Sequence, residues 1–321
     1  MRLYAFHRAP LTLPAGHPFP ASKYALLRES VVQACPEMPL LDAPEATEGE
    51  LALVHEPSYI DRVQRGLLSG AEQREIGFPW SVQMAQRARL SVGATTAAAR
   101  AALTDGVAAQ LAGGTHHAQA GKGSGYCVFN DVAVAARLMQ VERHRMLRQG
   151  LQVLVLDLDV HQGNGTAAIF QDDPSVFTLS LHGARNFPFR KQASDLDVEL
   201  PDGCDDATYL AALDDALAQA WRRLPRPADL VFFLAGADPH EADRLGRLRL
   251  TSDGLRQRDE QVFEALLERR IPVAVVMAGG YGRDVGVTVA IHLQTLRLAQ
   301  HYAARWQREV LVGETSPGRC S

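Results

Sequence analysis

Three side chains suited to metal binding and acid–base chemistry follow one short apolar run. The run Val153–Leu156 is too short for a helix and contains two valines, so it predicts a buried strand. Asp157, Asp159 and His161 alternate along its end and should therefore project to one side, where they form a candidate metal site. The alternative is that Asp157 is a hydrogen-bonded core carboxylate and His161 a helix cap, since short motifs match by chance.

The same pattern recurs along the chain, with an apolar run followed by glycine or chemically functional residues and then a helical stretch. The runs cover residues 107–112, 153–156, 176–181, 230–235 and 272–278. Strands that alternate with helices predict an α/β fold with a central, mostly parallel sheet flanked by helices. Ligands of such sheets bind beyond the carboxyl ends of the strands, so we expect the active site there.

Other segments complete the predicted architecture. Leu3 to Phe6 predicts a first strand, and Ser22 is expected to cap a helix that begins at Lys23. The proline-free, alanine-rich stretch 81–103 predicts a long helix packed on the sheet. No linker divides the chain, so we predict a single catalytic domain over residues 1–321.

Composition excludes several classes of protein. The 321 residues are 46% hydrophobic and carry a formal net charge of -4, so no direct nucleic-acid binding is expected. The first residues lack a long apolar run, which predicts no signal peptide, no membrane contact and a cytoplasmic location. Cys35, Cys127, Cys204 and Cys320 lack C-x-x-C spacing, which favours reduced thiols over disulfides or a thiolate metal site.

A third metal ligand is expected in the turn after the run 230–235. The carboxylate of Asp238, with Asp159 and His161, would leave a coordination position open for water or substrate, as a catalytic zinc site requires. Oxygen-rich sites also accept iron, cobalt or manganese, so the ligand types alone leave the identity of the metal open. Asp238 could instead be a plain turn residue before proline, with the neighbouring His240 as the ligand.

Two further clusters carry acid–base and hydrogen-bonding groups. His116 and His117 follow two glycines at a predicted strand end and could act as base and electrostatic partner beside a metal. Tyr281 follows Gly279 and Gly280, and its phenol could donate to a developing oxyanion. The structural alternatives are capping or core histidines and a packed tyrosine. Convergence of all these clusters at one sheet edge favours the metal site.

Six motifs resemble the zinc-dependent histone deacetylase family, in the family's order. They are GGTHHA at 113–118, GYCVFND at 125–131, DLDVHQGNG at 157–165, SLH at 180–182, GADPHEADRLG at 236–246 and AGGYG at 278–282. HPFPASKY at 17–24, and QGN in place of the commoner HGD, resemble the class IV branch and related bacterial deacylases. The resemblance implies an arginase/deacetylase-like fold and hydrolysis of an acyl amide on a lysine-like amine.

The resemblance also implies roles for matching residues: zinc ligands Asp159, His161 and Asp238, a proton-transferring pair His116 and His117, and a carbonyl-polarising Tyr281. It pairs His116 with Asp157, which would favour a positive His116. Asn164 stands where better-known members carry an aspartate beside His117. An amide can orient the ring but cannot stabilise its positive form, so His117 should have a lower pKa and suit the role of base.

A substrate tunnel and a second cation are implied in the same way. The resemblance places four residues around the tunnel: Gly125, Tyr126, Phe187 and Leu245. Apolar walls suit the methylenes of an extended acyl-lysine, and the alternative is that these are ordinary core residues. A potassium ion is implied near Asp157 and Ser180, with backbone carbonyls of Asp159, His161 and Leu181, because oxygen ligands suit a hard cation.

The predicted function is a zinc-dependent amidohydrolase that removes an acyl group from an acylated lysine of a protein. The alternative substrate is an acetylpolyamine or another small acylated amine. A rival from a different class is a catalytically weak, metal-dependent module that binds acyl groups. The full set of ligands, histidines and tyrosine favours the enzyme, since a binding module needs no acid/base pair.

Overall fold

The computed structural model describes residues 1–6 and 9–311. Its strands are β1 (Arg2–Ala5), β2 (Leu40–Asp42), β3 (Val107–Gln110), β4 (Val153–Asp157), β5 (Val176–Gly183), β6 (Leu196–Leu200), β7 (Leu230–Leu234) and β8 (Val273–Val276). They form one eight-stranded sheet in the order β2-β1-β3-β8-β7-β4-β5-β6, with every strand pair parallel. The predicted α/β fold with a parallel central sheet is confirmed.

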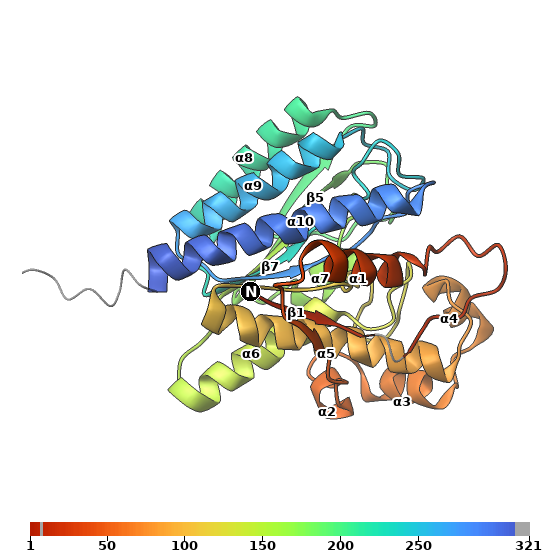
Figure 1. Ribbon diagram of the computed structural model, residues 1–321. Coiled ribbons are helices and arrows are strands. Elements are labelled where there is room, and N and C mark those ends of the chain that lie inside the picture. The colour runs from red at the N-terminus through yellow and green to blue at the C-terminus, as the bar shows by residue number, and fades with distance from the viewer. Residues whose placement is uncertain (7–8, 312–321) are drawn as a thin grey trace, which may run out of the picture.

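Helices cover both faces of this sheet (Figure 1). One face carries α1 (Lys23–Ala34), α8 (Asp206–Arg223), α9 (Ser252–Glu268) and α10 (Val285–Trp306), which ends in the π-helical turn η1 (Gln307–Leu311). The other carries α5 (Val82–Asp105), α6 (Asp131–Leu147) and α7 (Asn164–Phe170). The short helices α2 (Glu48–Leu51), α3 (Pro57–Arg65) and α4 (Gly70–Ile76) lie beside α5.

Side-chain alternation along the strands builds a core on each face. In β4, Leu154 and Leu156 pack into the cluster under α8, α9 and α10, whereas Val153 and Val155 pack into the cluster under α5 and α6. A strand buried on both faces is apolar at successive positions. The central strands were therefore visible in the sequence as short continuous apolar runs.

The strands at the two edges of the sheet were not predicted. β2 has three residues, and β6 mixes leucine and valine with aspartate and glutamate, so neither gives an uninterrupted apolar run. The prediction that Ser22 caps α1 is wrong. Its backbone is already helical, with φ -64° and ψ -23°, and its side chain makes no capping hydrogen bond.

Other predictions concern features outside the sheet. Within residues 1–6 and 9–311, no helix combines the length and apolar character that crossing a membrane requires. Cys35, Cys127 and Cys204 are buried free thiols, and Cys320 lies outside the described residues. The cytoplasmic location and the single domain over 1–321 stay predictions.

Candidate metal centre and active site

The candidate site lies where four neighbouring strands end. β3, β8, β7 and β4 are adjacent in the centre of the sheet. Their carboxyl ends lead into the functional segments 113–118, 278–282, 236–240 and 157–165. Because the strands are parallel, these segments meet at one edge, as the sequence pattern predicted.

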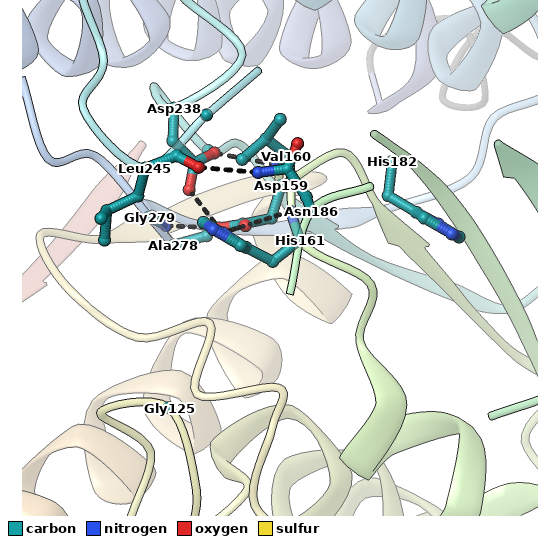
Figure 2. Close-up of polar contacts among 12 residues, drawn as sticks. Gly125, Asp159, Val160, His161, His182, Asn186, Asp238, Leu245, Ala278 and Gly279 are labelled. Carbon is teal, nitrogen blue, oxygen red and sulfur yellow. Dashed lines mark hydrogen bonds and ion pairs between the residues drawn. The ribbon is translucent and has the colours of Figure 1, made fainter. Parts of the chain in front are cut away.

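Asp159, His161 and Asp238 point toward one another at this edge (Figure 2). One potential ligand atom from each residue lies within 4.8 Å of the others, and all three residues are buried. Nδ1 of His161 is 2.9 Å from Oδ1 of Asp159 and 3.2 Å from Oδ2 of Asp238. The structure therefore brings the three predicted ligands together.

The electrostatics of this group favour a cation. Burial and the nearby carboxylate of Asp159 raise the pKa of Asp238 to about 7. Burial alone would lower the pKa of His161, but the carboxylates of the two aspartates beside it raise that pKa to about 10. Buried Oδ2 of Asp238 lies close to Nδ1 of His161, but among the described residues no donor meets this oxygen in hydrogen-bonding geometry. An unsatisfied carboxylate oxygen beside a second carboxylate and an imidazole fits a divalent metal.

Backbone N–H groups hold the two carboxylates in place. Gly279 N donates to Oδ2 of Asp159 at 2.6 Å, and His161 N donates to its Oδ1 at 2.9 Å. Val160 N donates to Oδ1 of Asp238 at 2.9 Å. A Cβ at Gly279 would lie 1.9 Å from Oδ2 of Asp238, so a residue with a side chain here would displace this carboxylate.

The hydrogen bonds predicted for the two histidines are present. Nδ1 of His116 lies 2.6 Å from Oδ2 of Asp157, and Nδ1 of His117 lies 2.7 Å from Oδ1 of Asn164. Burial alone would lower the pKa of His116, but the charges of Asp157 and Asp159 outweigh burial and raise it to about 9. Burial and the charge of His116 hold the pKa of His117 well below its usual value. The adjacent rings therefore favour different protonation states.

Tyr281 lies beside the candidate metal ligands Asp159, His161 and Asp238. Its ring is edge-on to that of His161, with 6.2 Å between the centroids. Burial and the charges of Asp159 and Asp238 raise the pKa of the phenol well above its usual value, so the hydroxyl stays protonated and able to donate. The backbone N–H of Tyr281 donates to Oδ2 of Asp243 at 2.6 Å, which anchors the turn.

The predicted tunnel residues line a cavity of about 870 Å³ together with His117, His161 and Tyr281. They are Gly125, Tyr126, Phe187 and Leu245. The ring of Phe187 meets that of His117 edge-on, with centroids 4.8 Å apart. Leu245 is 41% exposed, so it lies at the rim and not in the core. Gly125 has φ +52°, and a Cβ there would lie 2.6 Å from the His117 ring.

Lys23 was not predicted to belong to the site, but it lies buried against the Tyr281 turn. Its Nζ is 3.2 Å from the carbonyl oxygen of Gly280 and 3.4 Å from that of Ala278. The same ammonium is 5.2 Å from the centre of the Tyr281 ring. Lys23 is therefore a candidate positioning residue for this turn, and its only sequence signal was its place in HPFPASKY.

Asp131 is a second residue that sequence reasoning missed. Its carboxylate accepts hydrogen bonds from Gly114 N at 3.0 Å and Thr115 N at 2.8 Å, and from the Thr95 hydroxyl at 2.5 Å. Asp131 is fully buried. These bonds fix the turn that precedes the two histidines, and the GYCVFND motif gave the only hint of Asp131.

The rival ligand His240 is not part of the group formed by Asp159, His161 and Asp238. Its Nε2 lies 3.1 Å from Oγ of Ser252, and its Nδ1 accepts from Ala242 N at 3.1 Å. Both ring nitrogens are therefore engaged elsewhere, which favours Asp238 as the ligand.

The residues predicted for potassium lie on neighbouring strands. Asp157 of β4 pairs in register with Ser180 of β5, and Leu181 is the next residue of β5. Oγ of Ser180 lies 2.9 Å from Nδ1 of His182. The potassium ion itself stays a prediction.

The fold and the site define an α/β protein with a candidate metal centre at the carboxyl ends of its parallel strands, and comparison with known proteins identifies its family. Residues 17–296 match the histone deacetylase domain model, and this span contains every predicted site residue. The chain belongs to the histone deacetylase family. It is therefore an amide-hydrolysing deacetylase, and its family is typically metal-dependent.

Relatives of known sequence cover most of the chain. An uncharacterized protein of Picosynechococcus sp. is 44% identical over 298 residues, which is 90% of this chain and 94% of that protein. Histone deacetylase 2 of Arabidopsis thaliana is 31% identical over 87% of this chain and 73% of that protein. The human polyamine deacetylase HDAC10 is 33% identical over 80% of this chain, but only 41% of that longer protein is covered.

Solved structures share the fold at low sequence identity. The HDA15 HD domain has a TM-score of 0.76 and 22% identity, covering 97% of this chain and 96% of that one. An HDAC homolog complexed with SAHA has a TM-score of 0.79 and 23% identity, covering 94% of this chain and 84% of that one. These matches confirm the predicted arginase/deacetylase-like architecture.

The geometry predicts one divalent metal per chain, and Asp238→Ala should remove most of it because a charged ligand is lost. His240→Ala is the matched control, since His240 is bonded to Ser252 and should leave the metal in place. Metal content of both purified variants, measured by mass spectrometry after dialysis, checks this. Full metal content in Asp238→Ala would show that the ligand assignment is wrong.

Proposed function

We propose that this chain is a zinc-dependent amidohydrolase that removes an acyl group from an acylated lysine side chain. The proposal rests on one observation: the Asp159–His161–Asp238 group lies beside two histidines of different pKa and a protonated phenol. Similarity to the Arabidopsis histone deacetylase 2 supports the lysine substrate.

Asp159, His161 and Asp238 would hold the metal. Two carboxylates and one imidazole suit Zn²⁺ with a position left open, and Fe²⁺ or Co²⁺ are the alternatives. When bound, such an ion supplies Lewis-acid chemistry that polarises the acyl carbonyl and activates water at neutral pH.

His117 moves the proton between water and amine. The amide oxygen of Asn164 accepts a hydrogen bond from Nδ1–H, which leaves Nε2 of neutral His117 as a proton acceptor. Nε2 takes a proton as water adds to the acyl carbon, and gives it to the amine nitrogen as the C–N bond breaks. His116, kept positive by Asp157, stabilises the negative charge that develops during this addition.

Tyr281 provides a hydrogen-bond donor to the carbonyl oxygen. Its phenol remains protonated because its pKa is raised, so it can donate as the oxygen gains negative charge. Lys23 holds the carbonyl of Gly280, the residue directly before Tyr281, and thereby fixes the position of the ring. The donor is thus positioned before substrate arrives.

The cavity wall accounts for a lysine-like substrate. Tyr126, Phe187 and Leu245 present apolar surface between the rim and His117. Each buried methylene contributes about 0.8 kcal/mol, so such a wall holds the alkyl stem of an acyl-lysine while the polar groups act on the amide.

A potassium ion near Asp157, Ser180 and Leu181 would be structural, stabilising the end of β4.

An acetylpolyamine is the second candidate substrate, because the chain is 33% identical to the human polyamine deacetylase HDAC10. The rival from another class is a catalytically weak module that binds acyl groups. Nothing in binding alone needs two histidines of opposite protonation preference, so their pKa difference supports catalysis.

A panel of acyl-lysine peptides and acetylpolyamines, assayed with and without chelator, tests the proposed reaction. We expect turnover of acyl-lysine that chelator abolishes and Zn²⁺ restores. Metal-dependent turnover of acetylpolyamines alone would replace the lysine substrate with the alternative. Binding of acyl-lysine without turnover by the metal-loaded protein would support the binding module instead.

Tyr281→Phe removes one hydroxyl and should lower kcat roughly a hundredfold to a thousandfold, as expected for loss of one oxyanion donor. KM should change less, because the ring and the wall remain. Tyr126→Phe is the matched control, since its ring lies in the same cavity with its centroid 5.9 Å from that of Tyr281. Equal losses in the two variants would mean that Tyr281 has no special role.

Phe187→Ala should lower kcat/KM for an acyl-lysine peptide roughly tenfold, since contact with about two methylenes is lost. Phe187→Leu keeps an apolar wall and should retain most of the activity. Steady-state kinetics at unchanged metal content measure both effects. Unchanged kinetics in Phe187→Ala would remove Phe187 from the proposed tunnel.

A further inference from the structure

Positive charge gathers at the mouth of the substrate cavity. Among the described residues that line this cavity, five carry cationic side chains and one, Glu75, is acidic. We call the five the mouth cluster: Arg74, Lys122, Arg185, Arg190 and Arg247. The whole chain has a formal net charge of -4, so the mouth is opposite in sign to the protein around it.

Nearby carboxylates neutralise only part of this charge. Nζ of Lys122 lies 2.7 Å from Oε1 of Glu75, which forms one exposed pair. A single carboxylate, Asp202, serves two arginines, at 3.2 Å from Arg247 and 3.8 Å from Arg185. Exposed pairs of this kind are weak, so the arginines stay available to a ligand.

The positive charges of the remaining two members of the mouth cluster, Arg74 and Arg190, are not paired with a carboxylate in the described structure. Within residues 1–6 and 9–311, neither Arg74 nor Arg190 has a carboxylate within ion-pair distance, and both are exposed. Arg74 belongs to α4, and Arg190 belongs to the loop that carries Phe187, so the charge comes from two separate segments. Arg190 also follows Phe189, which is 85% exposed.

We propose that the substrate carries carboxylates close to its acylated amine. This inference rests on the proposed amidohydrolase function and adds the charge of the substrate to it. Two sources offer the same chemistry: an acyl-lysine flanked by aspartate or glutamate in a protein, and a small acylated amino acid with its own carboxylate. Substrates with several further ammonium groups, such as acetylpolyamines or lysine-rich segments, are disfavoured.

The physical reason is the field at the mouth. Clustered charges raise the rate of encounter with ligands of opposite sign and lower it for ligands of the same sign. The inner wall is apolar at Tyr126 and Phe187, so it recognises the alkyl stem of the substrate whatever charges lie outside the cavity. Salt screens exposed charges beyond about 10 Å at 0.1 M, so the preference must weaken as salt rises.

Three acetyl-lysine peptides that differ only in flanking residues, with aspartate, glutamine or lysine on both sides, test the proposal on the metal-loaded enzyme. Free Nε-acetyl-lysine and its amide separate the small-molecule source from the peptide source. We expect kcat/KM about tenfold or more higher for the aspartate peptide than for the lysine peptide, with the difference shrinking at 0.5 M salt. If the ratio of kcat/KM for free acetyl-lysine to that for its amide exceeds the ratio for the aspartate peptide to the lysine peptide, the substrate is the small acylated amino acid.

Charge reversal at the mouth assigns the effect to these residues. Arg74→Glu with Arg190→Glu should level or reverse the preference between the aspartate and lysine peptides. The matched control is Arg145→Glu with Arg222→Glu. Both arginines are exposed near the carboxyl ends of α6 and α8, which lead into the amino ends of β4 and β7. They therefore lie at the edge of the sheet opposite the substrate cavity. The control has the same net charge and should keep the wild-type preference.

The outcomes separate this inference from the function on which it rests. Equal or better turnover of the lysine peptide, or of a monoacetylated spermidine, overturns the inference and leaves the amidohydrolase intact. If no substrate is turned over, fluorescence polarisation of labelled peptides still decides: tighter, salt-sensitive binding of the aspartate peptide supports the charge assignment, and equal binding overturns it. A preference that persists unchanged in the mouth double variant also contradicts the proposal.

Discussion

Burial of three carboxylates at one sheet edge is the constraint on which the candidate site depends. Asp157, Asp159 and Asp238 are at most 2% exposed, so their charges repel one another without water to screen them. The protein offsets this cost locally. His116 pairs with the first carboxylate, His161 lies between the other two, and backbone N–H groups donate to the oxygens. A divalent cation bound by Asp159, His161 and Asp238 would extend the same compensation.

A second layer of buried positive charge supports the loops around these carboxylates. Arg258 of α9 is fully buried, donates to the carbonyl oxygen of Gly236 at 2.6 Å and pairs with Asp259 at 2.7 Å. Lys23 of α1 likewise donates to backbone carbonyl oxygens, those of Ala278 and Gly280 before Tyr281. Two helices on one face of the sheet thus each provide one cationic side chain that binds the backbone of a turn at the site.

The sequence predicted the parts of this arrangement that follow from regular structure. Because parallel strands end at one edge, clusters after four apolar runs had to converge, and Asp159, His161 and Asp238 do so. Lys23 could not be found in that way, because it bonds to a carbonyl 255 residues distant and lies in a helix with no unusual pattern. Asp131 likewise binds backbone N–H groups of a different segment. Contacts between side chains and distant backbone leave no periodic signal.

The place of β8 in the sheet limits when the sheet of this protein can be completed during synthesis. β8 alone joins β3 to β7, so without it the described strands separate into two groups, β2-β1-β3 and β7-β4-β5-β6. Among the described strands it is also the last to be synthesised. During synthesis, Asp159 and Asp238, which follow β4 and β7, are therefore made before β8. Until β8 is made, the surroundings of these carboxylates are incomplete. Such non-local parallel pairing forms slowly, so this period is when the chain most needs protection from aggregation.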